Sequence, residues 1–153
     1  MNVSPEQAAV LDDLCRQVAE SDRWLPQPGQ AVRDPKSGEV WRRLAPAWWV
    51  GSYVGWRLAD ADLELIRTGL YFPIGCSELQ RALAAGPDWR DEVTGLGLLA
   101  DLPDHALVRL RSDFDSTDVE WYVAAPDENV FNKTYSTRIE AVLRAWLKVF
   151  GGA

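Results

Sequence analysis

Two stretches of the chain place apolar residues at helical spacing, one near each end. In the first, apolar residues recur every three or four positions behind Ser4, which starts a capping-box pattern typical of a helix N-terminus. In the second, a similar stripe follows Thr137 and ends at two consecutive glycines. The pattern predicts amphipathic helices over residues 5–21 and 138–150, each with one face turned to a core.

Between these helices the pattern changes to short apolar runs with the alternation typical of strands. Such runs occur at residues 39–44 and 48–58, and at residues 106–112 and 117–125, which are separated by a turn and form a predicted hairpin. The run at residues 63–72 fits either a helix or a strand. Strands joined by short turns indicate a mainly antiparallel sheet.

Two short helices and one long loop complete the predicted layout. We expect helices over residues 77–85, where Ser77 begins another capping box, and over residues 91–100, where two glycines weaken the pattern. Residues 25–38 are rich in proline and glycine and predict a long surface loop. The predicted fold is α+β: residues 1–153 form one domain with a single mainly antiparallel sheet and the N- and C-terminal helices packed on one face.

Charge and composition exclude several classes of partner. The chain of 153 residues carries a net charge of −7, so the basic footprint typical of nucleic-acid binders and of proteins on anionic membranes is absent from the overall balance. The charge favours solubility and basic partners. No signal-peptide pattern and no apolar run of 18 residues occurs, and the two cysteines make no disulfide framework. We therefore expect a cytoplasmic protein.

The residues that usually carry catalysis are few. His105 is the only histidine, and no pair of Cys or His residues has the spacing of a zinc site. Cys15 lies on the apolar stripe of the first helix, where a thiol packs as a small hydrophobe. Cys76 precedes a predicted helix, which favours either a lowered thiol pKa or ordinary packing. The sequence predicts no catalytic constellation, no metal and no cofactor.

Two weak motif matches have simpler explanations. Residues 95–100 match the G-x-G-x-x-A form of the dinucleotide-binding fingerprint, but no strand is predicted before them, so a glycine-softened helix end is favoured. The acidic residues Asp113, Asp115, Asp118 and Glu120 suggest calcium, but the glycine and glutamate of a calcium-binding loop are missing at their positions. A solvated hairpin turn explains these carboxylates better.

The segment around residue 50 offers the most specific surface. Strand alternation places Trp49, Gly51, Tyr53 and Gly55 on one face, which we call the aromatic face, and the tryptophans at 48 and 56 on the opposite, core face. Glycines between aromatic rings leave a trough that another group approaches closely. Either the C-terminal helix fills this trough with an aromatic side chain, or a partner protein binds there.

The hairpin offers a second patch. Arg109 and Arg111 share one face of their strand, and Glu120 and Tyr122 share a face of the neighbouring strand. Cross-strand charge pairs would stabilise such a face modestly, and a partner-binding role is the alternative. The register of the two strands, and therefore which residues face each other, stays open.

The order of elements resembles that of type III secretion chaperones and of the YbjN-like proteins that share their layout, and also that of a class of immunity proteins. The resemblance implies a non-catalytic protein that binds another protein, often as a dimer. Our leading hypothesis is an adaptor, chaperone-like or immunity-like module. The alternatives are a small enzyme that uses Asp113, Asp115 or Glu120 as a base, and a small-ligand sensor at the aromatic face.

Overall fold

The fold is α+β, as the sequence predicts. The computed structural model describes residues 3–43, 56–58, 76–111, 119–126 and 133–151. In these ranges the elements follow one another as α1 (Pro5–Glu20), β1 (Ala31–Arg33), β2 (Val40–Arg43), β3 (Trp56–Leu58), α3 (Cys76–Ala85), α4 (Glu92–Ala100), β4 (Ala106–Arg111), β5 (Val119–Ala124) and α5 (Arg138–Phe150).

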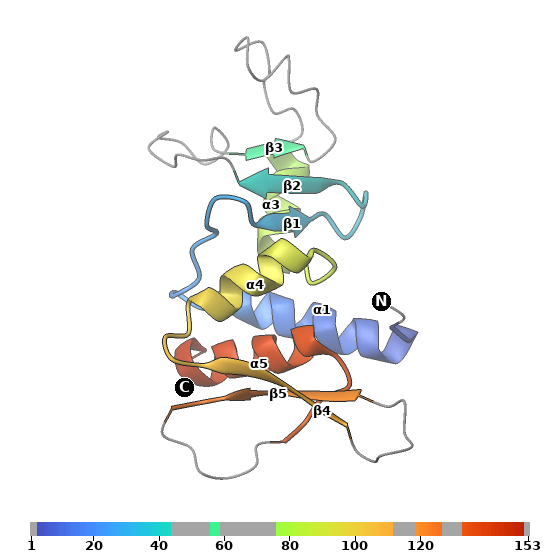
Figure 1. Ribbon diagram of the computed structural model, residues 1–153. Coiled ribbons are helices and arrows are strands. Elements are labelled where there is room, and N and C mark those ends of the chain that lie inside the picture. The colour runs from blue at the N-terminus through green and yellow to red at the C-terminus, as the bar shows by residue number, and fades with distance from the viewer. Residues whose placement is uncertain (1–2, 44–55, 59–75, 112–118, 127–132, 152–153) are drawn as a thin grey trace.

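The strands of the described ranges form two separate sheets with helices between them (Figure 1). One sheet has the antiparallel order β1-β2-β3 and packs against α3, and the other is the β4-β5 hairpin, which α5 covers. Helix α1 contacts both α3 and α5, and α4 packs on α5. The described residues do not confirm the single sheet with helices on one face, because their two strand groups each pack against their own helix.

The capping residues place the two terminal helices where the sequence predicts them. The Ser4 hydroxyl accepts the Gln7 backbone N–H at 3.2 Å, and the Gln7 side chain accepts the Ser4 N–H at 2.9 Å. The Thr137 hydroxyl caps α5 by accepting the Glu140 N–H at 3.3 Å. The apolar stripes are buried as expected: Leu11, Leu14, Cys15 and Val18 in α1, and Ile139, Val142, Leu143 and Trp146 in α5.

The buried side chains form two clusters, one for each sheet. The larger cluster joins α1, α4, β5 and α5, and it contains Trp146. The smaller joins the first sheet to α3 and contains Trp41 and Trp56. Trp56 is thus in a core, as the alternation predicts. Trp146 belongs to the other cluster, while the aromatic face itself lies outside the described residues.

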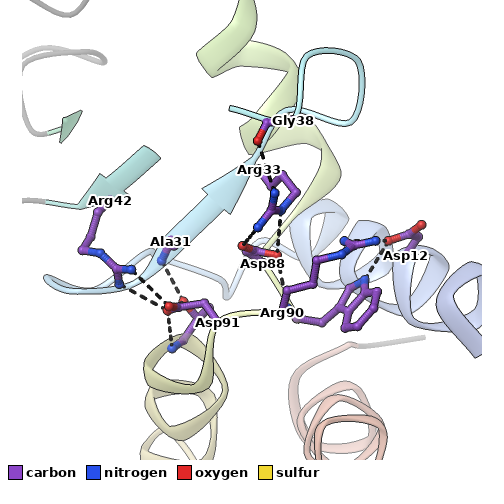
Figure 2. Close-up of polar contacts among 10 residues, drawn as sticks. Asp12, Ala31, Arg33, Gly38, Arg42, Asp88, Arg90 and Asp91 are labelled. Atoms are coloured by element: carbon purple, nitrogen blue, oxygen red, sulfur yellow. Dashed lines mark hydrogen bonds and ion pairs between the residues drawn. The ribbon is translucent and has the colours of Figure 1, made fainter. Parts of the chain in front are cut away.

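The predicted loop over residues 25–38 contains a short buried strand. Ala31 and Val32 of β1 are fully buried, and the Ala31 N–H donates to the Thr94 hydroxyl at 2.8 Å (Figure 2). The prediction was wrong here because β1 has only three residues and is surrounded by proline and glycine. Helix α3 already includes Cys76, so Ser77 lies inside its first turn.

The remaining predicted elements agree with the described ranges. Residues 39–44 contain β2, and β3 is the described end of the predicted strand at residues 48–58. Helix α4 begins after Asp91 and ends at Ala100, as expected. The ambiguous run at residues 63–72 lies outside the described residues.

The hairpin register settles which side chains share a face. Arg109 pairs with Trp121 and Leu110 with Glu120, so Arg109 lies on the face of Trp121. The register that the sequence leaves open is therefore one in which Arg109 and Glu120 do not lie opposite each other. Alternation along one strand cannot reveal which residue of the next strand lies opposite.

Candidate functional site

The first candidate site is a polar groove of about 640 Å3 beside α1, β1 and the loop that precedes α4. We call it the polar groove. Charged side chains of both signs line it, and four of them are drawn in Figure 2. The set comprises Asp12, Asp13, Arg16, Arg33, Asp34, Arg81, Asp88 and Arg90. What this groove can do depends on whether these charges are free or paired.

Asp34 is the most deeply buried charge of the polar groove. Its side chain is 0% exposed and accepts two hydrogen bonds from Arg81, from Nε at 3.1 Å and from Nη2 at 2.9 Å. The Ser37 hydroxyl and the Lys36 backbone N–H donate to the same carboxylate. The Arg81 guanidinium, with these two donors, holds the pKa of Asp34 well below its ordinary value despite burial. Asp34 is therefore a fixed anion and a poor general base.

Asp88 links the loop before α4 to β1 through an ion pair and a backbone hydrogen bond (Figure 2). Its carboxylate lies 3.4 Å from both Nε and Nη2 of Arg33 and accepts the backbone N–H of Arg90 at 3.2 Å. The Asp88 N–H in turn donates to the Ala31 carbonyl at 2.8 Å. This carboxylate is also fully engaged within the fold.

Asp91 performs three tasks at the start of α4 (Figure 2). It caps the helix by accepting the Thr94 N–H at 3.0 Å, and it accepts the Thr94 hydroxyl at 2.6 Å. It also forms a bidentate ion pair with Arg42 of β2 at 3.1 and 3.2 Å. Burial raises the pKa of Asp91, but the bonds from Arg42 and Thr94 outweigh it and lower the pKa overall.

Trp89 and Arg90 form the wall of the polar groove that faces α1. The Trp89 Nε1 donates to Asp12 at 2.7 Å, and the Arg90 guanidinium lies 4.0 Å from the Trp89 ring centroid and 3.8 Å from Asp12. Each charged side chain that lines the polar groove has a partner of opposite charge within the described residues. The polar groove is thus held by mutually neutralised pairs, which stabilise the fold and leave little charge for a ligand.

Cys15 is the only nucleophilic side chain in the lining of the polar groove. It is buried, and this burial raises the pKa of its thiol well above the ordinary value, with the nearby Asp12 and Asp88 carboxylates adding to the effect. A thiol of this kind stays protonated and unreactive at neutral pH. The prediction that Cys15 packs as a small hydrophobe is confirmed.

We expect Cys15 to resist thiol reagents in the folded protein. In a Cys76→Ser variant at pH 8, a disulfide reagent such as Ellman's should label no more than a small fraction of the protein within an hour, because the thiolate is scarce and covered. Addition of denaturant should release one thiol at once. Fast labelling of the folded variant would show that Cys15 is accessible.

The second candidate site is an apolar groove of about 220 Å3 between α4, α5 and β4. We call it the α4–α5 groove. Its apolar lining consists of Trp89, Leu96, Leu99, Leu107, Ile139 and Val142. Gly95 brings the two helices together, since a Cβ atom at this position would lie 2.9 Å from Ile139 Cδ1. An ion pair between Arg138 of α5 and Glu92 of α4 lies at its rim.

Helix α4 exposes apolar side chains beside this groove. Leu96 is 63% exposed and Val93 is 55% exposed, although the opposite side of the helix buries Leu98. The helix contains one charged residue, Glu92. A surface helix ordinarily turns polar residues to solvent, so this apolar outer stripe is unusual for an exposed helix face.

The structure also explains the glycines of the fingerprint-like stretch. A Cβ atom at Gly97 would lie 2.5 Å from the Gln30 side chain, and Gly95 faces α5. A turn precedes α4 where the fingerprint needs a strand. Both glycines serve close packing, and the interpretation as a softened helix is confirmed.

The residues put forward from the sequence are distributed as follows. Trp49, Gly51, Tyr53 and Gly55 lie outside the described residues, as do Asp113, Asp115 and Asp118. Arg109 is exposed on β4, and of Arg111 only the backbone is described. Glu120 is half-buried on β5 and lines none of the cavities discussed here.

Sequence reasoning missed the α4–α5 groove, although one signal was present. Val93, Leu96 and Ala100 recur at spacings of three and four in a helix that has almost no polar residues. When one side of such a helix is buried, apolar side chains remain exposed on its other side.

No described helix has the length and apolar character to cross a membrane. Across the described ranges, no group of three or more His, Cys, Asp or Glu residues is placed to hold a metal ion. No protein-family model, curated protein or solved structure matches the chain.

Proposed function

We propose that this protein is a non-catalytic, cytoplasmic protein-binding module whose partner places an apolar side chain in the α4–α5 groove. The observation that carries the proposal is the apolar outer stripe of α4, with Leu96 and Val93 more than half exposed beside a ready-made groove. Apolar surface next to a pocket with a charged rim is the arrangement found at energetic centres of protein interfaces.

The energetics favour a modest but specific interface. Covering a leucine side chain fully contributes about 1.5–3 kcal/mol, so Leu96 and Val93 together supply a substantial part of a micromolar affinity. The orientation of the bound partner, and the alignment of its residues with the groove, are set by the charged rim residues Arg90, Glu92 and Arg138.

The chemistry of the partner follows from the charge of the whole chain. With 23 acidic and 16 basic residues, the protein attracts cationic surfaces over a distance and speeds their association. The partner that fits is a protein with an amphipathic helix, whose apolar face enters the α4–α5 groove and whose flanks are basic. Reciprocal use of the groove by a second copy is the homodimer alternative.

The pairing of charges in the polar groove supports a binding role over catalysis. Asp34 and Asp88 are each held by an arginine, and Cys15 is protonated and covered. The carboxylate enzyme depends on Asp113, Asp115 or Glu120, of which only Glu120 lies within the described residues. The sensor depends on the aromatic face, which lies outside them.

A site-specific cross-link tests the proposal. A photoreactive phenylalanine at position 96 should join the protein to one partner in its native host, because this position lies at the centre of the contact. The same group at Val10, which is 40% exposed on α1, is the matched control and should give no such product. A product from position 10 alone, or none from either, would contradict the α4–α5 groove as the binding surface.

A Trp49→Ala variant separates the two surfaces considered for the partner. If the α4–α5 groove binds the partner, this variant should still give the cross-link from position 96. Loss of the product with an unchanged thermal midpoint would instead assign the partner to the aromatic face.

A further inference from the structure

A third cavity lies between α5 and the end of β5, on a different side of α5 from the α4–α5 groove. Its volume is about 400 Å3, and we call it the cationic pocket. The charged or titratable groups in its lining are His105, Lys133, Arg144 and Lys148, together with the hydroxyl-bearing Tyr135. No carboxylate occurs among its described lining residues.

This concentration of positive charge contrasts with the rest of the molecule. The chain has seven more acidic than basic residues, whereas three of the pocket's lining groups are permanent cations. Arg144 and Lys148 stand four positions apart on α5, a spacing at which like charges repel. Lys148 also complements the helix dipole in the last turn, and Arg144 pairs with Glu140 of the same helix, so neither effect explains the position of Lys133.

Arg144 is held in position by its neighbours. Its Nε donates to Glu140 Oε2 at 2.8 Å, and its guanidinium lies 5.2 Å from the Tyr135 ring centroid. Tyr135 is itself fixed by two backbone hydrogen bonds of 2.8 Å to Trp121. Glu140 engages the Nε side of the guanidinium, so a bidentate anion would bind Arg144 through its two terminal nitrogens.

The floor of the cationic pocket is apolar and made of small residues. Val123 and Ala141 are buried, and Ala125, Ala145 and Val149 complete the floor. Small side chains leave room above α5, and an apolar floor accepts a hydrocarbon or aromatic body. The pocket thus combines an anion-binding rim with an apolar base.

We infer that the cationic pocket binds a small organic anion, with its carboxylate or phosphate on Arg144 and Lys133 and its apolar body on the alanine and valine side chains of the lining. This site is separate from the α4–α5 groove and goes beyond the proposed function. Either anion satisfies the same guanidinium and ammonium groups, and the experiment distinguishes them.

The test uses three aromatic probes of similar size: benzoate, phenyl phosphate and neutral benzyl alcohol. Each is titrated into the full chain and followed by calorimetry and by amide shifts of Val123 and Ala145. At least one anion should bind, at least tenfold more tightly than the alcohol, and preference for one of the two anions identifies the chemical source. Arg144→Gln and Lys133→Gln should each weaken it severalfold, while Arg16→Gln on α1 should leave it unchanged.

Circular dichroism and thermal midpoints establish that each variant is folded before its binding is compared. Equal binding of the alcohol, no binding of either anion, or unchanged binding in both pocket variants would overturn the inference.

Discussion

Replacing Gly86 with alanine is expected to destabilise the fold by about 3 kcal/mol or more, the sum of a left-handed backbone penalty and a steric overlap. Gly86 has a φ of +90°, and a Cβ atom there would lie 1.9 Å from the Cys15 carbonyl oxygen. The obstacle is backbone of α1, which cannot rotate away as a side chain could. Urea denaturation followed by circular dichroism measures the loss.

Gly38 provides the matched control for this substitution. Its φ of +79° is equally unfavourable for alanine, but no atom lies within 4 Å of the position that a Cβ would occupy. Gly38→Ala should therefore cost about 1 kcal/mol, the conformational part alone. Equal losses in the two variants would mean that α1 does not approach Gly86 as closely as the structure shows.

Replacing Arg81 with alanine is expected to cost about 3 kcal/mol, because it leaves the buried Asp34 carboxylate without its ionic partner. The matched control is Arg16→Ala, whose ion pairs with Asp13 and Glu20 lie on the surface with the arginine 53% exposed. Removing exposed pairs costs about 0.5 kcal/mol or less. Chemical denaturation at pH 7 compares the two variants.

The pH dependence of the Arg81→Ala variant gives an independent check. Arg81 lowers the pKa of Asp34 in the folded protein, so this carboxylate stabilises the fold at pH values above the unfolded pKa of about 3.9. The contribution is lost as the pH falls toward the folded pKa. The gap in stability between wild type and variant should therefore be full at pH 7 and should narrow below about pH 4. A gap that stays constant down to pH 3 would contradict the ion pair.

The elements that the sequence predicts well are those with local signals. Ser4 and Thr137 mark the two terminal helices through side-chain bonds to residues three positions away, and Asp91 does the same for α4. The alternation of β4 and β5 on either side of a turn identifies the hairpin. These features depend on neighbours in the chain, which a single sequence displays.

The features that sequence reasoning missed depend on contacts between distant residues. Strand alternation identifies strands but not their partners, so the division into two sheets could not be foreseen. Two ion pairs of the polar groove, Arg33 with Asp88 and Arg81 with Asp34, join residues that are far apart in the chain, and no spacing rule reveals them. The sequence does not tell which apolar side of α4 is exposed. The structure does, because Gly95 packs against Ile139 of α5 and thus marks the buried side of the helix.

We propose that Leu96 anchors a partner protein at the α4–α5 groove. Calorimetric titration of the purified partner, once the cross-link has identified it, tests this proposal most directly. Wild type, Leu96→Asp and Val10→Asp are compared side by side. We predict that Leu96→Asp weakens binding about 30-fold or more, as expected for the loss of an interface hot spot, while Val10→Asp binds as wild type does. Equal affinity of all three proteins would contradict the claim.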